Sequence, residues 1–321
     1  MTLEIRPVHG IGDVTAGDDL AELITKAAPW LADGDVLVVT SKIVSKAEGR
    51  LVEVPADGPD REEARQRVLA GETARVVARR GPTTIVQTHH GFVMAAAGID
   101  ASNVDKTHLV LLPADPDASA RALRDGLRAR NLDVAVIISD TMGRAWRNGL
   151  TDVALGAAGI EALRDHRGEI DPYGNELTLT QMAVIDELAA AAELVKGKSD
   201  RVPVAVVRGY PRTVHSDRGA RELVRDTASD MFSLGTAEAR EQGLRDAARL
   251  SPESADADVA RFVAARTGAL RLTPAGPAPA DLLRLGAKAQ GVRVSLAAAG
   301  LRSTVDFDDE GVTVTIIEGD L

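Results

Sequence analysis

Short runs of aliphatic residues alternate with amphipathic stretches along most of the chain. The aliphatic runs predict buried strands and cover residues 3–8, 35–40, 83–87, 109–112, 134–139 and 203–208. Apolar residues at helical spacing, or many helix-forming residues, predict helices at residues 18–30, 62–79, 118–130 and 177–196. This order predicts a mixed α/β fold, in which ligands lie at the carboxyl ends of strands. The polar residues at two such ends, Ser41 and Asp140, are therefore the first candidates for a site.

A change of composition near residues 245–255 predicts two domains, residues 1–245 and a small α+β domain of residues 246–321. The second domain contains a stretch with three prolines, Pro274, Pro277 and Pro279, between predicted helices at residues 257–267 and 280–291. Residues 304–307 and 312–318, joined by an Asp-Asp-Glu-Gly turn, predict a β-hairpin. The function of this second domain does not follow from its sequence.

Composition excludes several classes of function. The chain has no cysteine, so disulfides, zinc–thiolate sites and cysteine nucleophiles are ruled out. The formal net charge of −10 argues against a nucleic-acid partner. No apolar run approaches the ~18 residues that a membrane-spanning helix needs, and the first residues do not resemble a signal peptide. We therefore expect a cytoplasmic protein without a membrane partner.

The segment from Ser139 to Gly149 carries the most suggestive chemistry. Asp140 ends a predicted buried strand, and the Thr141 hydroxyl follows it as a second hard oxygen, the type of ligand that Mg²⁺ and Mn²⁺ prefer. Arg147, a few positions on, could offset phosphate charge or bind an acidic substrate. The alternative for the Asp-Thr pair alone is a helix cap flanked by surface arginines.

Two other patches could contribute to the same site. In residues 97–103, Asp100 is a second candidate carboxylate and Asn103 can both donate and accept hydrogen bonds, although such a sequence also suits an ordinary turn. In residues 40–46, the hydroxyl of Ser41 and the ammonium of Lys46 follow a strand and could reach a phosphate, although a solvated basic turn is an equal alternative.

A glycine-flanked loop follows the first predicted strand, with the sequence Ile11, Gly12, Asp13 and Val14 after Gly10. This loop lacks the third glycine of the dinucleotide-binding fingerprint, and the chain has no Walker motif. The six histidines show no metal-ligand spacing and are expected to be structural or surface residues.

These patches, in this order, resemble the coenzyme F420-0:L-glutamate ligase family, which includes the N-terminal ligase domain of the actinobacterial bifunctional enzyme. The resemblance runs from Leu3 to about Gly243. The segments that carry it are residues 34–46, 95–104, 139–149, 171–177 and 194–198. The resemblance implies an α+β fold of the F420 ligase type, followed here by the small C-terminal extension.

The resemblance also implies an activity and a set of site residues. The family joins the amine of L-glutamate to a carboxylate of the F420-0 precursor, uses GTP, and is expected to form an acyl phosphate. Its positions for two divalent ions, Mg²⁺ or Mn²⁺ with K⁺ as a further candidate ion, match Asp100, Asp140 and Thr141. Its GTP contacts match Ile11, Gly12, Asp13, Val14, Ser41, Lys46 and Asn103. A homodimer is implied as well, and the predicted catalytic residues are Asp140, Lys46 and Arg147, the last on our own argument.

The chain departs from the family in three places. Some relatives carry a metal-contacting side chain near Lys198, a role that an ammonium group cannot fill. Met142 and Ala145 stand where many relatives have Phe and Pro. Residues 246–321 are too few for the flavin-binding domain of the bifunctional enzyme, so we expect no bound FMN. Two other functions stay open: a GTP- and metal-binding regulatory module without catalysis, and an amide ligase for another acidic substrate.

Overall fold

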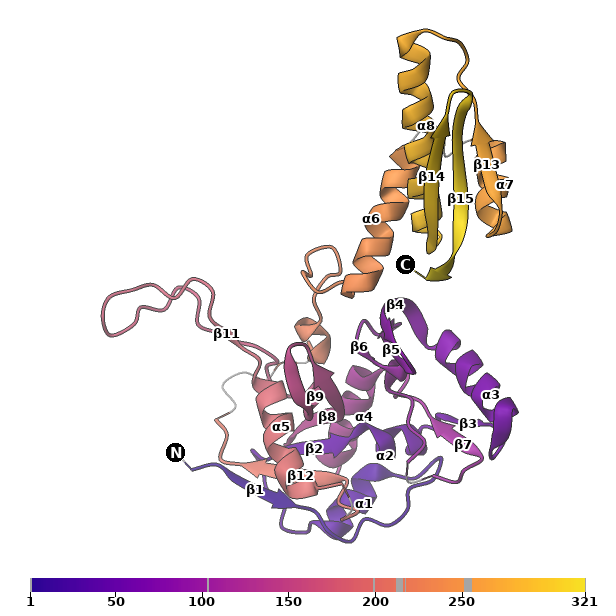
Figure 1. The fold of residues 1–321 in the computed structure, drawn as a ribbon. Helices are drawn as coiled ribbons and strands as arrows, with labels where there is room; N and C mark the ends of the chain where they lie inside the picture. Colours follow the sequence, from indigo (N-terminus) through magenta and orange to yellow (C-terminus); the bar gives the residue numbers. More distant parts are fainter. Residues whose placement is uncertain are drawn as a thin grey trace. The chain divides into compact units, whose positions relative to one another are not determined.

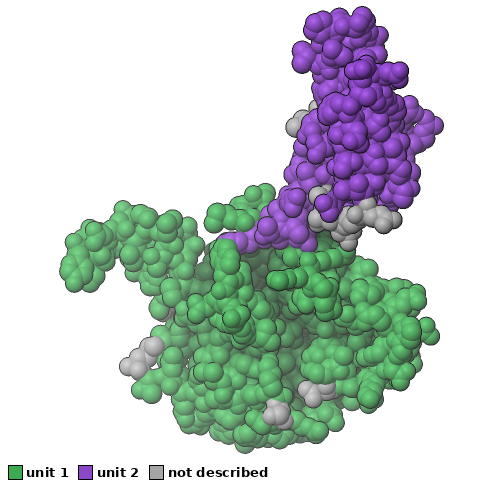
Figure 2. All heavy atoms as spheres, viewed as in Figure 1, with its two compact units in different colours: residues 1–231 green, residues 232–321 purple. Residues whose placement is uncertain are grey.

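The computed structural model describes residues 2–102, 104–198, 200–211, 216, 218–250 and 256–320. The chain forms two compact units, residues 1–231 and residues 232–321 (Figure 2). The sequence places its domain boundary later, at about 245–255. The first unit contains the predicted site residues. No helix among the described residues is long and apolar enough to cross a membrane.

A five-stranded sheet forms the centre of the first unit (Figure 1). Its strands, in spatial order, are β1 (Glu4–Pro7), β12 (Val204–Arg208), β2 (Val36–Thr40), β8 (Ala135–Arg144) and β9 (Arg147–Ala158). Only the β2–β8 pair is parallel within this sheet. Because β2 and β8 are parallel and Thr40 pairs with Ser139, Ser41, which follows β2, lies beside Asp140 in β8.

Helices cover both faces of this sheet, and the strand residues alternate between two cores. On one face Leu37, Val136 and Val206 pack with helices α1 (Leu20–Ala27), α2 (Ser41–Ala47) and α4 (Pro116–Arg128). On the other face Val38, Ile137 and Val207 pack with helix α5 (Val184–Lys196). Full burial on both faces explains why these strands are unbroken aliphatic runs rather than alternating ones.

Smaller elements surround the central sheet. They are β3 (Leu51–Glu53), α3 (Gly58–Gly71), β4 (Thr73–Arg80), β5 (Thr83–Thr88), β6 (Val93–Ala95), η1 (Ala96–Gly98), β7 (His108–Val110), β10 (Arg164–Asp165), β11 (Gln181–Met182) and η2 (Ala220–Leu223). Strands β10 and β11 are the base of a long arm that extends from the unit (Figure 1).

The structure corrects three of the predicted elements. The helix predicted at residues 62–79 ends at Gly71, because β4, rich in Val and Arg, pairs with β5 instead. The helix predicted at residues 177–196 begins only at Val184, after the arm returns through β11. The strand predicted to stop at Ser139 continues to Arg144 and turns directly into β9, which was not predicted.

The second unit consists of helices packed on a small antiparallel sheet. Its elements are α6 (Thr236–Leu250), α7 (Ala257–Ala265), β13 (Ala269–Leu272), α8 (Pro279–Ala298), β14 (Leu301–Asp308) and β15 (Gly311–Asp320). The predicted hairpin is confirmed as β14 and β15, whereas β13 was not predicted. Helix α6 contacts α8, which places the start of this unit before the predicted boundary.

Strand β9 approaches the start of helix α4 so closely that Gly156 has no room for a side chain. A Cβ atom at Gly156 would lie 2.1 Å from the carbonyl oxygen of Pro116, and a backbone atom there cannot move aside alone. We expect Gly156→Ala to lower the free energy of unfolding by about 3 kcal/mol, at the upper end of typical overpacking costs.

Gly143→Ala in β8 is the matched control for Gly156→Ala. A Cβ at Gly143 would meet only the Leu150 side chain, at 4.0 Å. Urea denaturation followed by circular dichroism compares the two variants. Equal transition midpoints for both would contradict the close approach of β9 to α4.

Candidate active site

A cavity of about 1180 Å³ lies in the first unit, at the edge of the sheet where β2 and β8 carry their polar residues. The predicted site residues that line it are Ile11, Gly12, Asp13, Val14, Ser41, Lys46, Asp100, Asp140 and Thr141. Four segments that are far apart in the sequence therefore meet around one space. Arg147 begins β9, is exposed and does not line the cavity, so its role stays a prediction. Asn103 lies outside the described residues.

The parallel pairing of β2 and β8 brings Ser41 and Asp140 together. Thr40 is the register partner of Ser139, so the next residue of each strand projects at the same edge. Ser41 begins helix α2, and its hydroxyl donates a hydrogen bond to Oδ2 of Asp140 at 3.0 Å. The backbone amide of Thr141 donates to the other carboxylate oxygen at 2.7 Å. The sequence predicts both residues at strand ends: Ser41 does follow the end of β2, whereas Asp140 lies within β8, which continues to Arg144.

The carboxyl group of Asp140 is held by neutral hydrogen-bond donors. Burial raises its pKa to about 6, and the neighbouring carboxylates Asp152 and Asp100 act in the same direction. The hydrogen bonds from Thr141 and Ser41 lower the pKa but do not restore it to the ordinary range. Among the described residues, no Lys, Arg or His forms an ion pair with Asp140. A carboxylate in this environment is stabilised by a cation that enters the cavity.

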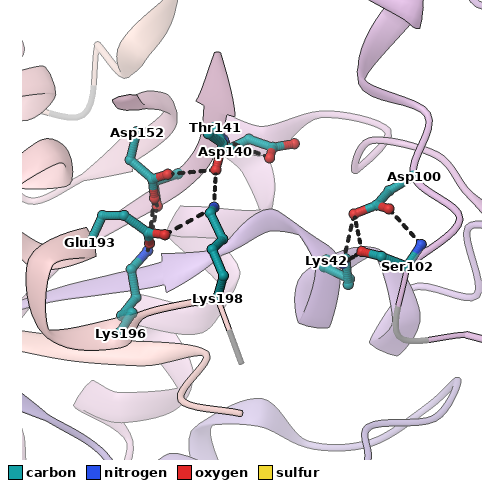
Figure 3. A network of polar contacts seen from close by, with 10 residues as sticks. Lys42, Asp100, Ser102, Asp140, Thr141, Asp152, Glu193, Lys196 and Lys198 are labelled. Carbon is teal, nitrogen blue, oxygen red and sulfur yellow. Dashed lines mark hydrogen bonds and ion pairs between the residues drawn. The ribbon is translucent and has the colours of Figure 1, made fainter. Parts of the chain in front are cut away.

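A buried polar network supports Thr141 from the side of the sheet (Figure 3). The Thr141 hydroxyl donates to Oδ1 of Asp152 at 2.9 Å, and Ser139 donates to Oδ2 at 2.8 Å. The ammonium of Lys196, only 1% exposed, lies 2.9 Å from Asp152 and 3.1 Å from the Ser139 hydroxyl. Although burial alone would raise it, the pKa of Asp152 is lowered by the charge and hydrogen bond of Lys196.

Glu193 connects this buried network to the cavity. Its carboxylate lies 3.3 Å from the ammonium of Lys196 and 2.9 Å from that of Lys198. Lys198 in turn donates to the Thr141 hydroxyl at 2.5 Å (Figure 3). The end of α5 and the residues that follow it are thus tied to the strand that carries the predicted metal ligands.

Asp100 is held by a second set of donors. The ammonium of Lys42 lies 2.6 Å from its Oδ2. The backbone amide of Ser102 donates to Oδ1 at 2.6 Å, and the Ser102 hydroxyl donates to Oδ2 at 3.1 Å. Although burial opposes it, the pKa of Asp100 is lowered by the Lys42 and Ser102 contacts. Asp100 is therefore an anion that faces the cavity with a lysine already bound to it.

Asp152 and Lys196 are not among the site residues predicted from the sequence. Lys196 did offer a signal: it lies four and eight positions after the buried Ala192 and Leu188, on the apolar face of α5. A lysine at such a position needs a buried anion as its partner. Asp152 lies in β9, a strand that was not predicted, so its burial could not be read from the chain.

The donor set fits a hard divalent cation. Asp140, Asp100 and Thr141 offer carboxylate and hydroxyl oxygens, which Mg²⁺ and Mn²⁺ prefer over nitrogen ligands. Two of the three are engaged by ammonium groups, and no cluster of three or more acidic or histidine side chains forms a ready metal site among the described residues. The fit therefore rests on the buried Asp140 carboxylate, which forms no ion pair with a described Lys, Arg or His.

Comparison with known proteins agrees with this fold and cavity. The sequence model of the family described as F420-0:Gamma-glutamyl ligase matches residues 10–209, which include every lining residue predicted from the sequence. The chain belongs to this ligase family, and the predicted α+β fold class is confirmed.

Curated relatives match over most of their own length. The Coenzyme F420:L-glutamate ligase of Methanothermobacter thermautotrophicus is 40% identical over 250 residues, which cover 72% of this chain and 99% of that protein. Ligases of the same description from Methanopyrus kandleri and Haloarcula marismortui are both 41% identical. They are covered over 98% and 95% of their lengths, and the matches span 72% and 71% of this chain.

Proposed function

We propose that this protein is a GTP-dependent ligase that joins L-glutamate to coenzyme F420-0, and to glutamylated forms of it, with release of GDP and phosphate. The observation that carries the proposal is the Ser41–Asp140 contact at the edge of the sheet, inside a cavity that also gathers Lys46 and Asp100. A phosphate-activating ligase needs a polyanion site beside a cation site, and this cavity offers residues for both. The names of the relatives support the substrates.

In the proposed reaction the chain's residues position GTP, and F420-0 and L-glutamate then react in turn. Asp140, Asp100 and Thr141 would hold Mg²⁺ or Mn²⁺, which when bound offsets the charge of the phosphates. Lys46 and the loop at residues 11–14 would bind the triphosphate, and Ser41 would orient Asp140.

A carboxylate oxygen of F420-0 forms a bond to the γ-phosphorus while the bond to the β–γ bridging oxygen breaks and GDP leaves. The glutamate amine then attacks the acyl carbon, loses a proton, and phosphate leaves.

Transfer of oxygen tests this route. F420-0 with ¹⁸O in its carboxylate is expected to deliver one ¹⁸O atom to the released phosphate for each amide bond formed, because phosphate leaves the acyl carbon with that oxygen. Mass spectrometry of the phosphate measures the transfer. Phosphate without ¹⁸O, in a reaction that still forms the amide, would contradict the acyl-phosphate route.

Amide formation with a different acidic acceptor in preference to F420-0 would instead support an amide ligase for another acidic substrate, the second function left open by the sequence.

We propose a homodimer as the working form. Its support is the arm between β10 and β11, where Ile170, Tyr173 and Leu179 are 71%, 91% and 89% exposed. Apolar side chains gathered on one projecting segment are typical of an interface. A monomeric mass in solution by light scattering would contradict this part of the proposal.

A further inference from the structure

Two ammonium groups contact predicted metal ligands that line the cavity, at two separate places (Figure 3). Lys42, from the first turn of α2, contacts Asp100 at 2.6 Å, and Lys198, just after α5, contacts the Thr141 hydroxyl at 2.5 Å (Figure 3). Both lysines line the cavity. Each therefore places a positive charge on an oxygen that a divalent cation would use.

The two contacts are built differently from the buried Lys196–Asp152 pair. The side chain of Lys198 is 68% exposed, and in the Lys42–Asp100 pair the lysine is 18% and the aspartate 40% exposed. Ion pairs that are open to solvent contribute little free energy, and lysine side chains are long and flexible. Lys196, in contrast, is almost completely buried and cannot leave Asp152 at small cost. Lys198 and, to a smaller extent, Lys42 reach solvent and can exchange partners, while the buried Lys196 is a fixed support.

We propose that Lys42 and Lys198 are exchangeable counter-cations. In the metal-free protein Lys42 balances the charge of the Asp100 carboxylate, and Lys198, paired with Glu193, donates to the Thr141 hydroxyl. When a divalent cation binds, both lysines release these oxygens and contact the phosphates of the bound nucleotide. The inference rests on the proposed metal and nucleotide site. It adds Lys42 and Lys198 to that site, first on the metal ligands and then on the phosphates.

The exchange has opposite effects on the affinities for the metal ion and for the nucleotide. Before nucleotide binds, the lysines compete with the metal, so the apparent metal affinity is lower than that of the bare oxygens. After the metal binds, the released ammonium groups remain in the cavity and add to the attraction for a triphosphate. Removal of either lysine should therefore strengthen metal binding and weaken nucleotide binding. A lysine with a purely structural role would not shift the two affinities in opposite directions.

Titration of the purified full-length protein with Mn²⁺, followed by electron paramagnetic resonance without nucleotide, measures the first consequence. We expect Lys42→Met and Lys198→Met each to bind Mn²⁺ roughly threefold to tenfold more tightly than wild type, the range of one weak ion pair plus one less like charge. Lys46→Met, which removes the same charge from the same cavity, is the matched control and should change the affinity less. Lys198→Arg should stay close to wild type, because a cation is retained.

Calorimetric titration with a non-hydrolysable GTP analogue at saturating Mn²⁺ measures the second consequence. Lys42→Met and Lys198→Met should bind the analogue several-fold more weakly than wild type. Unchanged or weaker Mn²⁺ affinity in both variants, with wild type binding Mn²⁺, would overturn the exchange and leave the proposed function intact. A wild-type protein that binds no Mn²⁺ would overturn the proposed metal site and the exchange together.

Discussion

Asp140→Asn is expected to abolish glutamyl transfer, with a loss of roughly 10³-fold or more in kcat, because several kcal/mol of charge stabilisation at the phosphates depend on the cation that Asp140 would hold. The substitution keeps the shape of the side chain, and the amide can still accept the hydrogen bond from the Thr141 backbone. Steady-state release of GDP in the presence of F420-0 and glutamate measures the loss. Activity close to wild type would remove Asp140 from the metal site.

The same variant provides its own control for folding. The folded-state pKa of Asp140 is raised to about 6, so the folded protein holds a proton that the unfolded chain has already lost. The contribution of this group to stability is therefore present at low pH and is lost as the pH rises through about 6. Asp140→Asn removes the charge, so the metal-free variant should be more stable than metal-free wild type at pH 8, by on the order of 1–3 kcal/mol. Thermal unfolding without metal measures the difference, which should shrink as the pH is lowered towards about 4.

Lys196→Met should have the largest effect on stability. The change leaves the carboxylate of Asp152 buried with only hydroxyl donors, and loss of one member of a buried ion pair typically costs about 3–5 kcal/mol. The double variant Lys196→Met with Asp152→Asn removes both charges and should recover most of this loss. The amide oxygen of Asp152→Asn can still accept a hydrogen bond from the Thr141 hydroxyl. Thr141, a predicted metal ligand, therefore keeps its support.

Lys198→Met is the matched comparison for Lys196→Met. Lys198 is two positions away and also contacts Glu193, but its side chain is 68% exposed against 1% for Lys196. We expect Lys198→Met to change the free energy of unfolding by less than about 1 kcal/mol. Urea denaturation of the variants settles the comparison. Equal losses for the two lysines, or no recovery in the double variant, would show that the Lys196–Asp152 pair does not hold the strand edge as described.

The central part of the fold was accessible from the sequence because its strands are buried on both faces. Short continuous aliphatic runs, such as the one before Asp140, are typical of strands buried on both faces. The polar residue at the end of such a run marks the edge of the sheet. That rule singled out Ser41 and Asp140 as candidates, and the structure brings the two into contact. The prediction of one helix over residues 62–79 is wrong. Charged residues with high helix propensity continue into β4, where pairing with β5 overrides that propensity.

The candidate site was only partly accessible. Local sequence identifies which residues can bind metal or phosphate, but it does not say which of them are already paired in the folded chain. The lysines on Asp100 and Thr141 come from segments about sixty residues away in the sequence, and only the folded chain brings them to these oxygens. The support of Thr141 by Asp152 depends on β9, whose polar and glycine-rich start conceals a strand.

Incubation of the protein with F420-0, L-glutamate, GTP and Mg²⁺, followed by mass spectrometry of the F420 species, tests the proposed function most directly. A ligase of this kind should produce species heavier by one or more glutamyl units, with one GDP released for each unit added, and only when all four components are present. GTP binding without any glutamylated product would instead fit a regulatory module that has lost catalysis, and would contradict the proposed function.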